Sequence, residues 1–419
     1  MDTTAGIVIM AVMGLLFVII SKWKRKMIKQ TLEQFKEKAN SYTLVIQGCD
    51  WGPAINKIIV NTDSIADFTK EDLTPSMFSV TAEGKQRTVT ECYFCDLNGN
   101  RQEDVNANDH IALELAVHPM QAEETPFLWN KDEEKNEWKE EYPYTISHKK
   151  LANPITVCND IFCPATTAFE SIKTFNRLSA CYYAPSTYDD GKKHPLIVWL
   201  HGAGEGGNDT DIVLLGNKVT ALAEEKIQSY FTEGAYVLCV QTPTVWMNHE
   251  TPYDIEKDEV TDKSSQYTQE CMKVITEFVK KHKAIDTSRI YLGGCSNGGY
   301  MTINLLLHYP SYFAAAYPIC EAYNDKWLTE QDIEKLSKVP LWFVAAENDD
   351  TVKPSEHIIP TAKRLPNAKV SLFKNVTTDD GTEYFGHWSW IYVFNDKCKT
   401  LSADGKEQSL WSWLAQQTL

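Results

Sequence analysis

The segment 294–298 reads Gly-Cys-Ser-Asn-Gly, a serine with a glycine two residues away on each side. An apolar run that predicts a strand, 289–294, leads into it, and an apolar helical pattern follows it. A serine on a sharp strand-to-helix turn needs such glycines because the neighbouring backbone approaches closely. The turn exposes the hydroxyl at the carboxyl edge of the sheet. The sequence therefore predicts Ser296 as a nucleophile, with the Asn297 N–H at a helix N-terminus facing the reaction centre.

A nucleophilic serine requires a base and an acid to orient that base, and both can be sought farther along the chain. The predicted strand 341–347 runs into Asp349 and Asp350, so either carboxylate could lie at a carboxyl strand end. Two histidines follow. His357 lies in a predicted helix close to the aspartates, whereas His387 lies in a loop beyond the next strand and can reach back over the sheet edge. We expect His387 to be the base and Asp349 the acid, with Asp350 as the alternative.

A third element of the same chemistry is the loop after the predicted strand 196–200. Small residues follow His-Gly there, which lets a backbone N–H of Ala203 or Gly204 face the nucleophile. Together with the Asn297 N–H, this donor would form an oxyanion hole. A phosphate-binding loop is the rival interpretation, but no basic residue occurs in 202–212 and the P-loop spacing is missing.

These residues predict a two-step reaction. His387 takes the proton of Ser296 as the serine attacks an acyl carbonyl, and Asp349 holds the imidazole tautomer. The backbone amides hold the tetrahedral oxyanion, and His387 then activates water for deacylation. The reaction requires no metal and no organic cofactor.

The elements that must position this site follow a strand–helix rhythm over 149–419. Long amphipathic stretches such as 267–282 separate apolar runs that are typical of buried parallel strands. These runs are 196–202, 236–242, 289–294, 314–321, 341–347 and 369–374. The pattern predicts an α/β domain with a doubly wound, mostly parallel sheet.

The preceding region, 41–148, has a different pattern. Short alternating segments separated by turn residues predict a small all-β sandwich of the immunoglobulin-like kind. The segments are 43–48, 55–62, 77–84, 87–96 and 110–117. The charged run 131–142 is interpreted as a solvated connection or an exposed edge, without a function.

The N-terminus carries a membrane signal. Residues 3–21 include no charged side chain, and a helix of that length is roughly 28 Å long, close to the thickness of a bilayer core. We expect a transmembrane anchor at 3–21 followed by a basic stalk at 22–40. Residues 21–40 carry seven Lys or Arg and two Glu, so the positive-inside rule predicts a cytoplasmic catalytic domain. An extracellular domain on the same anchor is the alternative.

Composition excludes other classes. The 419 residues are 43% hydrophobic and 23% charged, which does not fit a disordered chain. The formal net charge of −16 argues against nucleic acid as a partner, because phosphate binding needs a basic surface.

With these motifs, the chain resembles the esterase branch of the alpha/beta-hydrolase superfamily, near feruloyl esterases and polyhydroxybutyrate depolymerases, a group that includes proteins described as peptidases. The resemblance rests on segments 196–207, 285–302, 342–352 and 386–390. The region from Tyr42 onward resembles the immunoglobulin-like N-terminal domain of some bacterial esterases. The resemblance implies carboxylic-ester hydrolysis, and the valine three residues after the acid in similar enzymes implies Asp349.

Three functions are therefore compared. The leading one is a serine carboxylesterase that acts on small or carbohydrate-linked esters through an acyl-enzyme on Ser296. The second is a serine peptidase of the prolyl-oligopeptidase type with the same triad. The third is a non-catalytic, membrane-anchored binding protein, which the presence of every triad and oxyanion element makes the least favoured.

Overall fold

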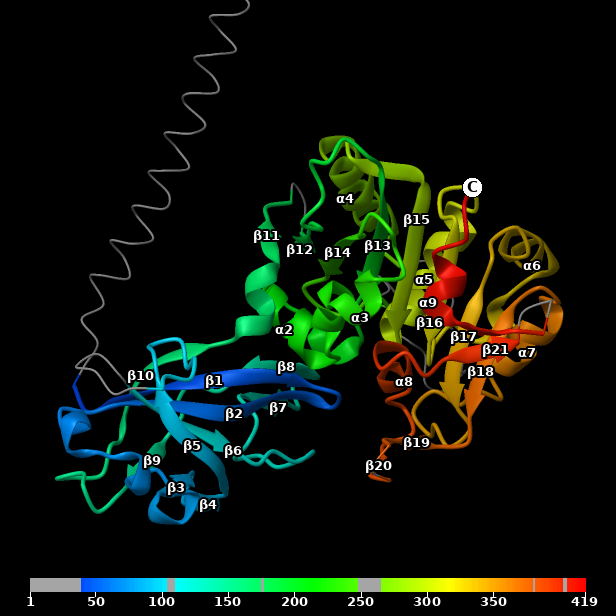
Figure 1. The fold of residues 1–419 in the computed structure, drawn as a ribbon. Coiled ribbons are helices and arrows are strands. Elements are labelled where there is room, and N and C mark those ends of the chain that lie inside the picture. The colour runs from blue at the N-terminus through cyan, green and yellow to red at the C-terminus, as the bar shows by residue number, and fades with distance from the viewer. Residues whose placement is uncertain (1–38, 104–109, 175–176, 248–264, 380, 402–404) are drawn as a thin grey trace, which may run out of the picture. The chain divides into compact units, whose positions relative to one another are not determined.

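The structure, a computed structural model, describes residues 39–103, 110–174, 177–247, 265–379, 381–401 and 405–419 (Figure 1). The chain divides into two compact units that are not continuous in sequence. Of the described residues, the first unit takes in those up to Leu44, together with Lys57–Leu115 and Pro143–Ile161. The second takes in Val45–Asn56, Ala116–Tyr142 and Phe162–Leu419. The domain limits 41–148 and 149–419 expected from the sequence stay predictions.

The second unit is built on an eight-stranded sheet in the order β11-β12-β14-β13-β15-β16-β17-β18 (Figure 1). Its strands are β11 Glu170–Ile172, β12 Ser179–Tyr183, β13 His194–Leu200, β14 Tyr236–Gln241, β15 Ile285–Cys295, β16 Ala315–Ile319, β17 Trp342–Ala346 and β18 Lys369–Phe373. Neighbours from β14 to β18 pair in parallel, whereas β12 is antiparallel to both β11 and β14. The six parallel strands are the six runs that the sequence predicted, and β11 and β12 were not anticipated.

Helices cover both faces of this sheet. The helices of this unit are α2 Thr210–Gly216, α3 Glu225–Gln228, α4 Thr268–Lys281, α5 Asn297–His308, α6 Glu330–Leu336, α7 Ile358–Arg364, α8 Trp390–Phe394 and α9 Leu410–Leu414. One apolar core joins alternate residues of the strands to α4, α5, α6 and α7, and a second core joins the intervening residues to α2, α3, α8 and α9. In β13, for example, Leu196, Val198 and Leu200 belong to the first core and Ile197 and Trp199 to the second. The strands are apolar throughout because both of their faces are buried.

Strands dominate the N-terminal region. A five-stranded sheet has the order β10-β1-β2-β6-β5, a three-stranded sheet the order β4-β3-β9, and β7 and β8 form a separate hairpin. The strands are β1 Ser41–Cys49, β2 Gly52–Asn61, β3 Ser79–Ala82, β4 Lys85–Arg87, β5 Val89–Cys95, β6 His110–Leu115, β7 Phe127–Asn130, β8 Lys135–Trp138, β9 Tyr144–Ser147 and β10 Val157–Phe162. The five strand segments predicted from the sequence are all strands here.

Two further hairpins lie near the C-terminus. They pair β19 Val376–Thr377 with β20 Glu383–Tyr384, and β21 Lys399–Leu401 with β22 Glu407–Ser409. The first of them leads into the loop that carries His387.

The predicted transmembrane anchor at 3–21 and nearly all of the stalk at 22–40 lie outside the described residues. Within the described ranges, no helix has both the length and the apolar character that crossing a bilayer requires.

Candidate active site

Ser296 lies between the end of β15 and the start of α5, as the sequence predicted. Its backbone has φ 54° and ψ −116°, a region that residues other than glycine rarely adopt. Its side chain is partly exposed, whereas Cys295 and Asn297 on either side are buried. The Ser296 N–H donates to the carbonyl of Ile319 at 2.9 Å, which ties the turn to β16. Backbone strain of this kind persists where the surroundings impose it, and it is common at active sites.

The glycines on either side of Ser296, Gly294 and Gly298, are required for steric reasons. A Cβ at Gly294 would lie 2.6 Å from the carbonyl carbon and oxygen of Gly298. A Cβ at Gly298 would lie 2.0 Å from the carbonyl oxygen of Leu200. Any side chain at either position would therefore push the turn away from β13. The close approach of strand and helix accounts for the spacing of the motif.

Asp349 and His387 are brought together from separate elements. Asp349 follows β17, and its Oδ2 lies 2.8 Å from Nδ1 of His387. Asp349 Oδ1 accepts the N–H groups of Thr351 and Val352, each at 2.9 Å. Asp349 and His387 are 2% and 8% exposed, whereas the side chain of Asp350 is exposed. The carboxylate is thus held by three hydrogen bonds, and Nδ1 of the imidazole donates one of them.

His357 takes no part in this pair. It stands immediately before α7, and its Nδ1 bonds to the carbonyl of Lys353 at 2.9 Å. The structure therefore places the ring of His387, and not that of His357, against the Asp349 carboxylate.

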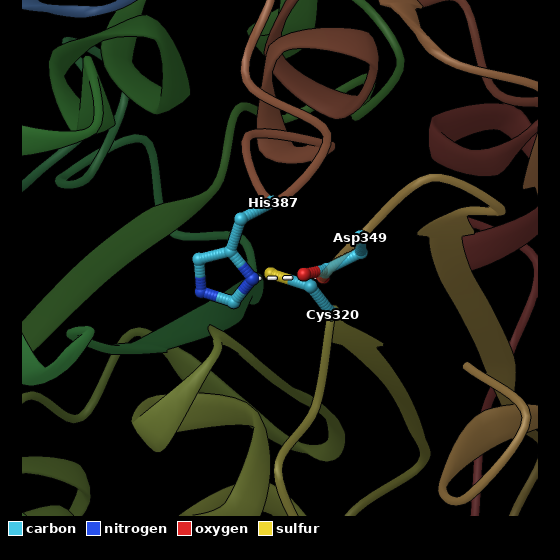
Figure 2. A group of neighbouring side chains, drawn as sticks. All are labelled: Cys320, Asp349 and His387. Atoms are coloured by element: carbon cyan, nitrogen blue, oxygen red, sulfur yellow. Dashed lines mark hydrogen bonds and ion pairs between the residues drawn. The ribbon is translucent and has the colours of Figure 1, made fainter. Parts of the chain in front are cut away.

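Cys320, which no sequence motif marks, lies beside the Asp349–His387 pair. Figure 2 shows the imidazole directed toward the carboxylate with the Cys320 thiol next to their hydrogen bond. Ligand atoms of all three side chains lie within 4.8 Å of one another. Cys320 directly follows Ile319, the residue whose carbonyl accepts the Ser296 N–H. Through this contact the serine turn and the acid–base pair meet at the carboxyl ends of neighbouring strands.

The chemistry of Cys320 is that of a neutral thiol. Burial raises its pKa well above the ordinary value, and the nearby Asp349 raises it further. A thiol, a carboxylate and an imidazole form a donor set that a soft divalent cation could use. In the structure, however, the carboxylate and the imidazole bond to each other. A protonated thiol is also a poor nucleophile, which leaves that role to Ser296.

The two residues predicted to supply a loop donor to the oxyanion hole follow the strand β13. Ala203 and Gly204 lie in a short 3-10 helix, η5 Ala203–Glu205, directly after β13. Asn297 is the first residue of α5, and its side-chain Oδ1 accepts the N–H of Trp246 at 2.6 Å. With the side chain engaged there, the Asn297 backbone N–H stands in the first turn of α5, where N–H groups have no partner within the helix.

The buried side chain of His201 holds the loop after β13 in place through its hydrogen bonds. The residue is fully buried, and its Nε2 accepts the N–H of Thr242 at 3.0 Å. Nδ1 must then carry the proton, and it donates to the carbonyl of Gly202 at 2.6 Å. Burial lowers the pKa of His201 to about 4, so the ring is neutral at pH 7. Trp246 completes the support because its Nε1 donates to the His201 carbonyl at 3.0 Å.

Glu205, the last residue of η5, has a buried side chain that packs against Gly202 and Gly216. A Cβ at Gly202 would lie 2.9 Å from its Oε2, and a Cβ at Gly216 would lie 2.6 Å from its Cγ. Burial raises the pKa of Glu205 to about 7, although a hydrogen bond from the Gly202 backbone opposes the rise. The carboxyl is therefore largely protonated below neutral pH.

Replacing Glu205 by glutamine should make the protein relatively more stable at alkaline pH. Below about pH 4.5 the wild-type carboxyl is protonated both folded and unfolded. As the pH rises toward 7 the unfolded chain loses this proton first, so the wild type loses stability, by about 3 kcal/mol once the folded carboxyl has also ionised. Glutamine has no such loss. The difference in thermal midpoint, variant minus wild type, should therefore be larger at pH 8 than at pH 5.

The matched control is Glu225→Gln, which removes one negative charge at an exposed glutamate. Its midpoint difference should stay nearly constant over the same pH range. An equal pH trend in both variants would show that total charge, and not the burial of Glu205, causes the effect.

Cys320 and Glu205 could not be identified from the sequence, for different reasons. Cys320 directly follows β16, the strand between the nucleophile strand and the acid strand, so the strand order, once known, points to it. Glu205 lies in a segment that the sequence distinguishes only by its small residues and its lack of basic residues, and no signal in the sequence marks this glutamate as buried.

Comparisons with known proteins give matches in both the N-terminal and the C-terminal part of the chain. Residues 41–154 match the esterase Ig-like N-terminal domain, and residues 258–334 match the prolyl oligopeptidase family. A crystal structure of a thermostable esterase is similar over 90% of this chain and 100% of its own, with a TM-score of 0.69 and 21% identity. No curated protein sequence matches the chain.

Two other solved structures are similar over less of this chain. A ferulic acid esterase covers 54% of this chain and 93% of its own, with 11% identity and a TM-score of 0.39. The acylaminoacyl peptidase of Pyrococcus horikoshii covers 55% of this chain and 41% of its own, with 16% identity and a TM-score of 0.35. The family matches and the thermostable esterase confirm the predicted alpha/beta-hydrolase fold and the Ig-like N-terminal domain.

Proposed function

We propose that this chain, a serine hydrolase of the alpha/beta-hydrolase superfamily, hydrolyses carboxylic esters through an acyl-enzyme on Ser296. The substrates are small or carbohydrate-linked esters. His387 acts as general base and Asp349 holds its tautomer, while the N–H groups of Asn297 and of Ala203 or Gly204 stabilise the oxyanion.

The observation that carries the proposal is the hydrogen bond between His387 Nδ1 and Asp349 Oδ2 at the sheet edge where Ser296 lies. Since Nδ1 donates to the carboxylate, Nε2 keeps its lone pair and can accept the serine proton. The buried carboxylate also stabilises the imidazolium that forms during attack. A pair arranged this way has a clear use in nucleophilic catalysis and little use as packing.

The proposed reaction has two covalent steps that use these residues. The serine oxygen attacks the ester carbonyl, and its proton moves to Nε2 of His387 as the tetrahedral intermediate forms. The intermediate collapses when His387 protonates the leaving alcohol, which leaves an ester bond to Ser296. Water, deprotonated by His387, then attacks this ester. The bond between the acyl carbon and the Ser296 oxygen breaks, His387 returns its proton to that oxygen, and the acid is released.

The second candidate is peptide hydrolysis by the same residues. It is favoured by the match of residues 258–334 to the prolyl oligopeptidase family. Esters are preferred here because the matched N-terminal domain is described as an esterase domain and because the fold extends over the full length of a thermostable esterase.

Turnover of two chromogenic substrates tests the choice. The full chain should release nitrophenol from p-nitrophenyl acetate and should leave a dipeptide p-nitroanilide intact under the same conditions. Cleavage of the anilide without ester turnover would show that the esterase assignment is wrong and that the chain is a peptidase. Absence of both activities, together with no labelling by a fluorophosphonate, would favour the non-catalytic alternative.

A further inference from the structure

The hairpin of β7 and β8 lies beside the candidate oxyanion loop. Residues 116–142, which include the hairpin, belong to the same compact unit as the hydrolase sheet. Strand β8 packs against η5 and against α2. The charged run 131–142 was expected to be a solvated connection or an exposed edge without a function, but the part of it that forms β8 lies next to Ala203 and Gly204.

The side chains that face the loop are set by the hairpin register. Phe127 pairs with Trp138, and Trp129 pairs with Asn136. Directly opposed residues of an antiparallel pair share one face, and residues two apart share it as well. These four side chains therefore lie on one face of the hairpin, while Leu128 lies on the other.

One end of this face is attached to the N-terminus of α2. Trp138 Nε1 donates to Oδ2 of Asp209 at 2.8 Å, and Asp209 caps the N-terminus of α2. Phe127 is buried and meets Trp138 edge to face, with ring centroids 4.7 Å apart. The hairpin is thus held in place at one end by a hydrogen bond and an aromatic contact.

The other end of the face meets Gly204. A Cβ on Gly204 would lie 3.2 Å from Cζ3 of Trp129 and 3.1 Å from Nδ2 of Asn136. The indole and the carboxamide therefore lie next to a candidate oxyanion donor. Trp129 is nonetheless 51% exposed, so about half of this residue's surface remains accessible to solvent.

We propose that Trp129 and Asn136 form a sugar-binding subsite and that the ester substrate carries a pyranose ring on its alcohol side. An indole face offers a flat apolar surface to the C–H groups of a pyranose ring, and a carboxamide both donates and accepts hydrogen bonds, as sugar hydroxyls require. Their place beside Gly204 puts such a ring close to the ester carbonyl. This inference rests on the proposed esterase function and specifies its substrate class.

The test compares two acetate esters across four variants of the full chain. The substrates are methyl β-D-xylopyranoside monoacetate and ethyl acetate, which share the acyl group and differ in the ring. Trp129→Ala and Asn136→Ala should each lower kcat/KM for the sugar acetate about tenfold, mainly through KM, and should change ethyl acetate less than twofold. Trp129→Phe should recover part of the loss. Leu128→Ala, on the same strand with a side chain 40% exposed on the opposite face, should leave both substrates unchanged.

The outcomes separate this inference from the proposed function. Suppose that the wild type hydrolyses esters and that Trp129→Ala lowers kcat/KM equally for both acetates. Trp129 would then have a structural role only, and the proposed sugar-binding subsite would be wrong. A third substrate, benzyl acetate, checks the ligand chemistry. If its turnover falls in Trp129→Ala while Asn136→Ala leaves the sugar acetate unaffected, the site takes an aromatic ring and the sugar assignment is wrong. No ester turnover by the wild type would instead refute the proposed function.

Discussion

Replacing Ser296 by alanine should lower kcat for ester hydrolysis by about 10⁶-fold, because removal of the nucleophile disables both covalent steps at once. The residual rate should come from binding and from the oxyanion donors, which the substitution leaves in place. Alanine at this position keeps the left-handed backbone as strained as serine does, so the fold should survive. Initial rates on p-nitrophenyl acetate and the thermal midpoint, measured on the same preparation, check both parts.

A matched serine-to-alanine change provides the control. Ser337 is exposed at the C-terminal end of α6, where its hydroxyl donates to the carbonyl of Glu334. Ser337→Ala should retain full activity and full labelling by a fluorophosphonate, whereas Ser296→Ala should lose both. Labelling that persists in Ser296→Ala would mean that another side chain is the nucleophile.

Much of this site could be predicted from the sequence because its parts depend on local patterns. Ser296 is marked by glycines two residues away, and a Cβ at either glycine would collide with backbone. Asp349 and His387 were selected by the strands that precede them, since parallel strands deliver their carboxyl ends to one edge. Their hydrogen bond then follows from topology.

What could not be predicted depends on contacts between distant segments. The charged run that forms β8 has the composition of a solvated loop, and only its pairing with β7 gives Trp129 and Asn136 a common face. Burial of Glu205 likewise depends on Gly216 of α2, which comes near only after folding. The antiparallel strands β11 and β12 were missed because they are short and lack the apolar character of the central strands.

Replacing Asp349 by asparagine should lower kcat by about 10⁴-fold with little change in stability. Oδ1 already accepts the N–H groups of Thr351 and Val352, so the asparagine oxygen should remain there. The amide NH₂ would then face Nδ1 of His387, which could only accept a hydrogen bond from it. The imidazole proton would have to move to Nε2, and the base could no longer take the proton of the serine.

The neighbouring Asp350 provides a matched control for the Asp349→Asn variant. Asp350→Asn carries the same chemical change one residue away, at an exposed side chain. We expect its activity to stay within twofold of the wild type, and we expect Asp349→Asn to recover part of its rate at high pH, where hydroxide replaces the missing base. If the large loss occurs in Asp350→Asn instead, the acid has been assigned to the wrong residue. If both variants remain active, the hydrogen bond between Asp349 and His387 does not serve catalysis. Such a result would mean that His387 works equally well in either tautomer and needs no acid to orient it.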